Sequence, residues 1–382
     1  MPTREDMKRL FLKHKEHSLS HRYITHKHIE PLLEKRSDIL HVETIGQSVL
    51  NNPIYGLKIG NGKKRILMWS QMHGNESTTT KALFDLFNTF LDTHSEFNYI
   101  LEACTLYIIP ILNPDGALAY TRINANGVDL NRDAQKLTQP ESHVLRHIFE
   151  TFKPHFCYNL HGQRTIFSAG TTNNSATVSF LAPAQDAACT ITPNRKVAME
   201  VIGVMNDTLQ RMIPNQVGVY DDAFNLNCVG DTFQSENVPT ILFEAGHFKN
   251  DYEREKTREL IYTSYLTSLN YISTNEVNGS HYNTYFNIPE NDKCFLDIII
   301  RNAKVTHELV DIGIQFQERL HDNKIEFIPK VERIEKLDGF FGHKEIEANG
   351  FEVRDAHGRV LKLGYENVCV ILNSEKITLL PK

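Results

Sequence analysis

The sequence lacks several features that define whole classes of proteins. It contains no stretch of 18 apolar residues, so we expect no helix that spans a membrane. It has no run of basic residues, and 47 aspartates and glutamates outnumber 41 lysines and arginines, for a net charge of -6. This mild acidity gives nucleic-acid binding little electrostatic support. The charged first 22 residues lack the apolar core of a secretory signal, which predicts a cytoplasmic protein.

Cysteine is scarce as well. The six cysteines are widely scattered and form no C-x-x-C pair, which argues against a cysteine-based zinc ribbon. Cys104, Cys157 and Cys369 lie in apolar strand-like runs, where a small buried thiol is the expected state. In a chain without a secretory signal we expect the cysteines to be reduced.

Histidine, by contrast, is abundant, with 18 in the chain. Several of them fall within the first 28 residues, where no cysteine sits beside the first two. We therefore expect this group on the surface of a solvated helix, although a metal role for its first two members is an alternative. The group consists of His14, His17, His21, His26 and His28.

From residue 41 to residue 272 short apolar runs alternate with helical patterns. A continuous apolar run is typical of a parallel strand buried on both faces, and apolar residues three and four apart predict an amphipathic helix. This alternation predicts an α/β fold with a largely parallel sheet covered on both faces. The expected strands are 65–70, 104–112, 155–160, 177–181 and 239–244, and the expected helices are 77–94, 141–152, 194–213 and 252–272.

The two ends of the chain have a different character. Residues 1–38 predict an N-terminal extension of one or two polar helices, closed by a turn at Ser37-Asp38. The segment 275–287, rich in Asn, Gly, Ser and Tyr, has the composition of a linker. Short β-like runs separated by turns then predict a small β-rich domain at 285–382. Within it, residues 340–343 read as an apolar turn that could pack on the main domain, which we place at 39–275.

Polar side chains cluster where the predicted strands end, which is the edge at which open α/β sheets bind ligands. These clusters share residue types that bind metals, anions or protons. They are His73-Gly-Asn-Glu76, Asp129-Leu-Asn131-Arg132 together with Arg122, His161-Gly-Gln-Arg164, and Glu244-Ala-Gly-His247.

The first and third clusters suit a metal. An H-x-x-E sequence across a strand-to-helix turn can bring the His73 imidazole and the Glu76 carboxylate to one ion, and His161 is a natural third ligand. Zinc favours such nitrogen and oxygen ligands, and a catalytic site keeps one position open. Each cluster also has a purely structural explanation, a capped helix for Glu76 and a strand-end histidine for His161.

The second and fourth clusters suit an anionic substrate and a general base. Arg132 can pair bidentately with a carboxylate, although a solvated surface loop is the alternative. Glu244, at the end of an apolar strand, needs a partner or a function, such as accepting a proton from a metal-bound water. A paired structural carboxylate would explain it equally well. His247 is a poorer metal candidate.

The order of these clusters resembles the zinc carboxypeptidase family, the carboxypeptidase A-like metallopeptidases, over roughly residues 40–270. The resemblance rests on the H-x-x-E, the Asn-Pro-Asp-Gly turn at 113–116, the Gly-Val-Asp-Leu-Asn-Arg stretch at 127–132, the histidine after a strand and the late glutamate. It implies an α/β/α sandwich around a mixed eight-stranded sheet.

The resemblance also implies roles for single residues. It implies one zinc ion per chain held by His73, Glu76 and His161, with Asp129 orienting the first histidine. Glu244 resembles the general base. Separately, Asn131 and Arg132 resemble the pair that binds the terminal carboxylate of the substrate, and Arg122 resembles the arginine that stabilises the oxyanion.

One feature of the family is less clearly matched. Many members carry a mobile tyrosine before the catalytic glutamate, and Tyr220 is the only tyrosine in 217–243. A stacked loop tyrosine without a catalytic part fits equally well. The stretch 221–233 is expected to build the side-chain pocket, and its polarity favours a polar or charged terminal residue. The polar positions are Asp222, Asn225, Asn227 and Asp231.

Three functions remain open from the sequence. The first is a zinc metallocarboxypeptidase that acts on a peptide with a free C-terminal carboxylate. The second is a zinc-dependent deacylase of N-acyl amino acids, of the desuccinylase or aspartoacylase type, which can also carry a C-terminal β-domain. The third, an inactive zinc-binding module, is disfavoured by the presence of Glu244, Arg122 and Arg132. The long match at 127–132 favours the peptidase.

Overall fold

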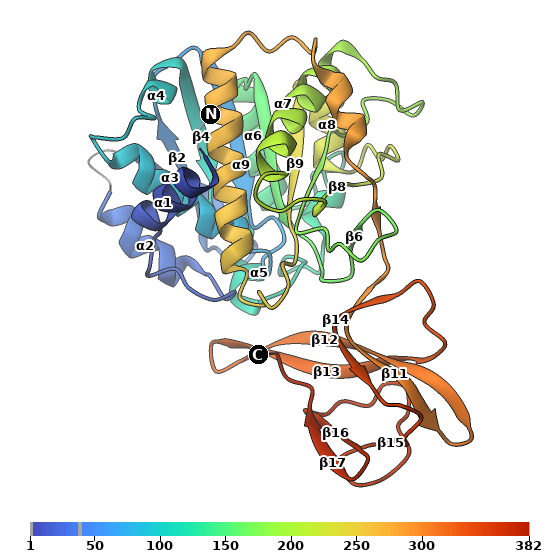
Figure 1. The fold of residues 1–382 in the computed structure, drawn as a ribbon. Coiled ribbons are helices and arrows are strands. Elements are labelled where there is room, and N and C mark those ends of the chain that lie inside the picture. Colours follow the sequence, from blue (N-terminus) through green and yellow to red (C-terminus); the bar gives the residue numbers. More distant parts are fainter. Residues whose placement is uncertain (1–2, 37–39, 382) are drawn as a thin grey trace.

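In the computed structural model, residues 3–36 and 40–381 are described, and they form a large α/β domain followed by a smaller β-rich region (Figure 1). The parallel pairs of the main sheet lie at its centre and at one edge, and antiparallel pairs lie between them and at the other edge. The predicted α/β class with a mixed, largely parallel sheet is therefore confirmed. In spatial order the sheet contains β1 (His41–Gln47), β2 (Pro53–Ile59), β4 (Cys104–Ile109), β3 (Lys64–Ser70), β5 (Phe156–Gly162), β9 (Thr240–Ala245), β7 (Val178–Leu181) and β8 (Val217–Val219).

Helices cover both faces of this sheet. One face packs against α3 (Thr78–Leu91), α7 (Pro193–Leu209) and α9 (Glu255–Thr274). The opposite face packs against α6 (Pro140–Phe152) and α8 (Val229–Ser235). The layers are thus those of an α/β/α sandwich, as expected.

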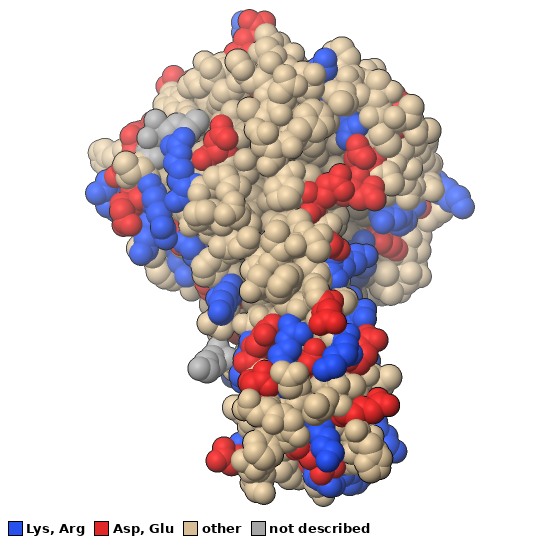
Figure 2. Space-filling model, turned by 45° about the vertical axis from the view of Figure 1, so that its right-hand side comes forward, with Lys and Arg blue, Asp and Glu red and all other residues tan. Residues whose placement is uncertain are grey.

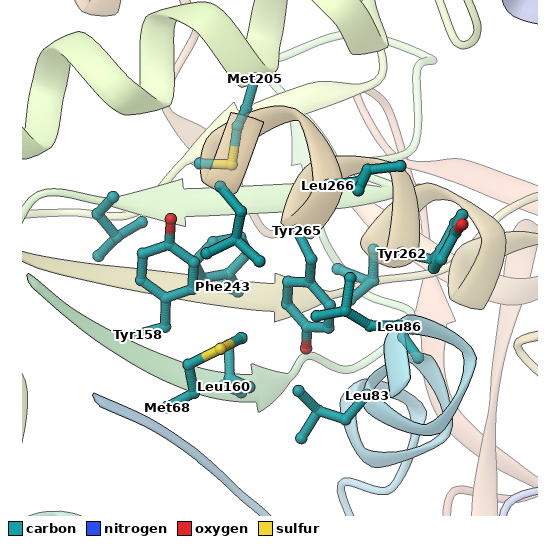
Figure 3. Close-up of a cluster of buried hydrophobic side chains, with 14 of the residues drawn as sticks. Met68, Leu83, Leu86, Tyr158, Leu160, Met205, Phe243, Tyr262, Tyr265 and Leu266 are labelled. Atoms are coloured by element: carbon teal, nitrogen blue, oxygen red, sulfur yellow. The ribbon is translucent and has the colours of Figure 1, made fainter. Parts of the chain in front are cut away.

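The core explains why the central strands are mainly apolar. Side chains alternate between the two faces of a strand, so a sheet covered on both sides buries them all. In β3, Ile66 and Met68 join the cluster under α3 and α9, whereas Leu67 and Trp69 join the cluster under α6 and α8. Figure 3 shows the first cluster, with residues of the sheet facing residues of the helices. Those labelled are Met68, Tyr158, Leu160 and Phe243 of the strands and Leu83, Leu86, Met205, Tyr262, Tyr265 and Leu266 of the helices.

The Asn-Pro-Asp-Gly sequence at 113–116 begins a helix and does not simply close a turn. The Asn113 side chain accepts a hydrogen bond of 2.8 Å from the Gly116 amide, and Pro114 occupies the first position of α5 (Pro114–Ala119). An asparagine cap and a proline at the first helical position both favour a helix start. The expected turn was wrong because turn residues and helix-capping residues are the same types.

The N-terminal extension forms the two predicted helices, α1 (Arg4–His14) and α2 (His26–Glu34). Helix α1 packs on the main domain, with the rings of Phe11 and Tyr262 5.7 Å apart. His14 is only 5% exposed, and its Nε2 lies 3.1 Å from the Asp92 carboxylate, so the expectation of an exposed histidine was wrong at this position. The turn expected at Ser37-Asp38 lies outside the described residues.

Glu16, between these two helices, predicts a pH-dependent part of the stability. Burial opposes its ionisation, but hydrogen bonds from the Ser18 hydroxyl (2.8 Å) and the Arg36 guanidinium (2.6 Å) lower its pKa to about 2. A carboxyl group whose pKa is lower in the folded than in the unfolded chain stabilises the fold at pH values above its unfolded pKa. This contribution is lost as the pH falls towards 2. We expect Glu16→Gln to lower the free energy of unfolding by about 1–3 kcal/mol at pH 7.

Urea unfolding measured between pH 7 and pH 3 tests this expectation. The difference between the wild-type protein and Glu16→Gln should shrink by about half at pH 3. The exposed Glu5, replaced in the same way, serves as the control and should change stability little at either pH. An equal loss for Glu16→Gln at both pH values would contradict the assignment.

The C-terminal region is β-rich, as predicted. It is composed of two small sheets with a hydrophobic cluster that draws on both. The first contains β13 (Lys324–Glu335), β12 (Glu308–His321), β11 (Phe295–Val305) and β14 (Phe341–Glu347), and the second contains β15 (Val353–Arg354), β16 (Cys369–Leu372) and β17 (Glu375–Thr378).

Two expectations near this region were incomplete. The apolar segment 340–343 runs into strand β14, and it does contact the main domain, since His343 Nε2 lies 2.7 Å from the Thr165 carbonyl. The segment 275–287 contains the 3-10 helix η2 (Tyr282–Asn287), whose Tyr285 is buried in the main core. The linker composition therefore hides an ordered element.

Figure 2 shows basic and acidic side chains interspersed over the β-rich region. Among the described helices none is long and apolar enough to cross a membrane. All six cysteines are free, and four of them are buried.

Candidate functional site

Most of the strand-end residues predicted from the sequence line one cavity of about 700 Å³. His73 and Glu76 follow β3, whereas His161 lies near the end of β5 and Glu244 near the end of β9. The parallel register places His161 directly beside Glu244, and Ser70 beside Leu160. The structure therefore brings together side chains that lie up to 171 positions apart (244 − 73).

Three of these side chains converge on one point. His161 Nδ1 lies 3.0 Å from His73 Nδ1 and 3.0 Å from Glu76 Oε2, and His73 Nδ1 lies 3.0 Å from Glu76 Oε1. Their ligand atoms all lie within 4.8 Å of one another. Two imidazole nitrogens and a carboxylate form the donor set that zinc prefers. Two imidazole nitrogens at this distance can either share a proton or both bind one cation, and the adjacent Glu76 carboxylate favours a cation, so the residues fit the metal.

The loop that carries His73 depends on a glycine. A Cβ atom at Gly74 would lie 1.9 Å from the backbone carbon of Gly116, so no larger residue fits where the two loops cross. On the other side, the Gly162 amide donates a hydrogen bond of 2.9 Å to Glu76 Oε2. The ends of β3 and β5 are therefore tied together through the carboxylate itself.

Asp129 fixes the orientation of His73. Its Oδ1 lies 2.9 Å from His73 Nε2, which makes that nitrogen the donor and leaves Nδ1 with a free lone pair facing the other two side chains. Arg122 donates to Asp129 Oδ2 at 3.0 Å and lies 3.5 Å from Glu76 Oε1. The guanidinium of Arg122 is 48% exposed, so it borders both the carboxylates and the cavity.

Asn131 and Arg132 lie in the 3-10 helix η1 (Leu130–Arg132) and line the same cavity. The Asn131 Oδ1 accepts a hydrogen bond of 3.0 Å from the backbone amide of Val229. This bond uses only the side-chain oxygen of Asn131, so its side-chain NH₂ group can donate to a ligand. The exposed Arg132 donates to the Asn131 carbonyl at 2.8 Å, and no carboxylate of the described chain pairs with it. This cation is available to an anionic ligand.

The pKa values of the two glutamates of the site are shifted in opposite directions. Burial opposes ionisation of Glu76, but the adjacent His73 and His161 hold its pKa well below the ordinary value. Burial and the negative charge of Glu76 raise the pKa of Glu244 well above its ordinary range, with Arg122 opposing. Glu244 Oε2 is buried and has no hydrogen-bond partner among the described residues. Glu244 is thus a carboxyl group suited to hold a proton.

The pKa values of the two histidines, His161 and His73, are also shifted in opposite directions. Burial lowers the pKa of His161, which keeps its ring neutral. Burial would also lower the pKa of His73, but the carboxylates of Glu76 and Asp129 raise it. A neutral ring is the form that binds a metal, and His161 is already in that form.

Tyr220 and two of the four polar residues predicted to build the side-chain pocket line the cavity. Tyr220 lines the cavity, and its ring centroid lies 5.2 Å from that of Phe167. Burial and the charge of Glu244 raise its pKa far above the ordinary value, so the phenol is neutral. Asn225 and Asp231 line the cavity, and burial raises the pKa of Asp231 to about 6.

Two pocket candidates do not reach the cavity. Asp222 forms an ion pair with Arg195 instead, and Asn227 is not among the residues of the wall. His247, the poorer metal candidate, is also outside the ligand group and packs against His343 with ring centroids 4.3 Å apart.

Several cavity residues were missed by the sequence reasoning. Arg22 comes from the N-terminal extension, and Tyr252 and Arg254 come from the loop before α9. Further wall residues belong to β12 and β13 of the C-terminal region. No local motif marks any of them, because each reaches the cavity through tertiary packing.

The convergence of three ligands predicts the result of removing one. We expect His161→Ala and His73→Ala each to weaken zinc binding by about 100-fold or more, because only two protein ligands would remain. Zinc content after dialysis against a chelator measures this. His247→Gln is the matched control, a buried histidine outside the ligand group, and should retain one zinc per chain. Zinc retained by His161→Ala would contradict the assignment.

Comparison with known proteins finds carboxypeptidases among the proteins of similar sequence. The chain is 27% identical over 99 residues to carboxypeptidase 2 of Trichophyton rubrum, covering 26% of this chain and 18% of that protein. It is 33% identical over 128 residues to carboxypeptidase SOL1 of Arabidopsis thaliana, covering 30% and 26%. These matches span no more than about a quarter of the relatives' length.

Solved structures show the same fold at low identity. The metallo-carboxypeptidase of Burkholderia cenocepacia superimposes with a TM-score of 0.51 at 15% identity, over 65% of this chain and 69% of that chain. The sequence model of the family described as zinc carboxypeptidase matches residues 25–225, slightly more than half of the chain. The protein belongs to the zinc carboxypeptidase family.

Proposed function

We propose that this protein is a zinc-dependent metallocarboxypeptidase that hydrolyses the C-terminal peptide bond of a peptide. One observation supports the proposal above the others. A single cavity holds the His73, Glu76 and His161 ligand group and a buried carboxyl with a raised pKa at Glu244. It also holds Arg132, which pairs with no carboxylate among the described residues. These are the parts needed to bind a terminal carboxylate beside a bond to be hydrolysed.

The metal and the general base divide the chemistry. When bound by His73, Glu76 and His161, a zinc ion would supply a Lewis acid and lower the pKa of water at its open position. Glu244 accepts the proton of the attacking water and then donates it to the leaving amine. The raised pKa of Glu244 makes its carboxylate a stronger base than an ordinary glutamate, which favours the first of these proton transfers.

The arginines act on the substrate. Arg122 lies beside Glu76 and at the cavity, where its N–H groups can donate to the oxygen that becomes negative as the carbonyl is attacked. Arg132 and the Asn131 amide bind the terminal carboxylate. Fixing the carboxylate sets the register, so that the last peptide bond meets Glu244. Tyr220 closes one side of the same cavity.

A deacylase acting on N-acyl amino acids is the second candidate. It is favoured by the C-terminal β-rich region, which contributes residues to the cavity wall. The same ligands, base and carboxylate-binding residues would serve this reaction. Only the group on the acyl side of the amide would differ.

Product analysis separates these functions. The zinc-loaded protein is incubated with a peptide library and with N-acyl amino acids, and products are identified by mass. Release of single C-terminal residues supports the carboxypeptidase, and release of acyl acids from N-acyl amino acids alone supports the deacylase. Absence of both products would overturn the proposal and leave an inactive zinc-binding module.

A further inference from the structure

The C-terminal β-rich region supplies part of the cavity wall. Figure 1 shows this region next to α5, at the end of the main domain where the parallel strands terminate. We call the contributing side chains the β-wall. The β-wall consists of Asp297, Gln315, Phe316, Gln317, Glu318 and Phe327.

The β-wall lies across the sheet edge from the carboxylate-binding residues. Asn131 follows Leu130 of the cluster under α6 and α8, and it is bonded to Val229 at the start of α8. The β-wall instead contacts Tyr252, just before α9 on the opposite face, through a 3.0 Å hydrogen bond to Asp297. His73 and His161, at the ends of β3 and β5, lie between the two. A peptide whose carboxylate is at Arg132 must therefore extend its amino side towards the β-wall.

The β-wall is held in place by buried polar contacts. Glu318 accepts hydrogen bonds from Arg22 at 2.6 Å and from the Tyr120 hydroxyl at 2.7 Å. Gln315 donates to the Thr165 hydroxyl at 2.6 Å. The rings of Phe327 and Tyr252 lie 5.3 Å apart. These contacts reach the N-terminal extension and the loop after β5 as well as the loop before α9, so the region is fixed on three sides.

We propose that the β-wall limits the length of the substrate on the amino side, so that the protein acts on short peptides. This inference rests on the proposed peptidase function. A volume of about 700 Å³ lies within the range of sites for small molecules, roughly 300–1,000 Å³, and β-wall side chains from β12 and β13 line it. The amino side of a longer peptide has to pass Gln317 and Phe327.

A peptide series with one fixed C-terminal residue tests the proposal. N-acetylated peptides from dipeptide to octapeptide are assayed with the zinc-loaded full-length protein. We expect kcat/KM to fall by about tenfold or more between the tripeptide and the octapeptide. A second readout avoids turnover: calorimetric binding of the same peptides to Glu244→Gln should weaken over the same range of lengths.

Two variants and a control identify the residues responsible. Phe327→Ala and Gln317→Ala shorten the β-wall and should raise kcat/KM for the octapeptide by about fivefold or more, while the tripeptide changes little. Phe351→Ala is the matched control, since Phe351 is 48% exposed on the same region and lies outside the β-wall. It should leave the length dependence unchanged.

The two proposals fail in different ways. If no peptide of any length is cleaved or bound, the proposed function fails. If octapeptides are cleaved as well as tripeptides by the wild-type protein, the peptidase function stands and the length limit is overturned. A length limit that neither β-wall variant relaxes would also overturn the role assigned to these residues.

Discussion

Replacing Glu244 with glutamine is expected to lower kcat by about 10²–10⁴-fold while leaving the zinc content at one per chain. Glutamine has the same shape but cannot take up and return a proton. Glu244 Oε2 has no hydrogen-bond partner among the described residues, so the change removes no bond at that atom. Glu244 also lies outside the ligand group, which is why zinc should remain.

Steady-state kinetics on a cleaved peptide, together with metal analysis of the same sample, measures both quantities. Glu253→Gln serves as the control, because Glu253 is 49% exposed and lies outside the cavity wall. Its kcat should match that of the wild-type protein. Turnover retained by Glu244→Gln would remove the general-base assignment, and loss of zinc would place Glu244 among the ligands.

Replacing Arg258 with methionine is expected to lower the free energy of unfolding by about 3–5 kcal/mol. Arg258 and Asp85 are both fully buried between α9 and α3, and two hydrogen bonds of 2.6 Å join them. Arg258 also donates to the carbonyls of Leu19 and Glu16 at 2.6 and 2.8 Å. Its loss would leave a buried carboxylate and two backbone acceptors without their donor.

Urea unfolding of single and double variants separates the contribution of the ion pair to the free energy of unfolding from that of side-chain packing. The double variant Asp85→Asn with Arg258→Met should be more stable than Arg258→Met alone, because no unpaired charge stays buried. Lys256→Met, on the same helix, is the control and should cost less than about 1 kcal/mol, because its ion pair with Glu259 joins neighbouring turns only. A loss below about 1 kcal/mol for Arg258→Met would contradict the expected penalty.

The parts of the site that could be predicted are those written into local sequence. His73 and Glu76 are three positions apart, and the strand before them is recognisable from its apolar run. Since parallel strands end at one edge of a sheet, His161 and Glu244 could be placed near them without any knowledge of the intervening helices. The strand positions could be predicted by the same logic of burial on two faces.

The remaining parts depend on packing that no local pattern encodes. Nothing near Arg22 indicates that it reaches the cavity, since its partner Glu318 lies in another region of the chain. His14 looked like a surface residue because only the tertiary fold brings Asp92 to it. Asn113 could be recognised as a turn former, but whether a turn continues into a helix depends on the packing of the residues after it.

The hydrogen bond between Arg22 and Glu318 also has a consequence for the synthesis of the chain. The two residues are 296 positions apart, so at a synthesis rate of about 5–20 residues per second Arg22 waits roughly 15–60 s for its partner to leave the ribosome. The sheet with His73, His161 and Glu244 is complete well before then. A nascent chain of this length therefore already contains the sheet edge with its candidate ligands, whereas the β-rich region that lines part of the cavity is still to be synthesised.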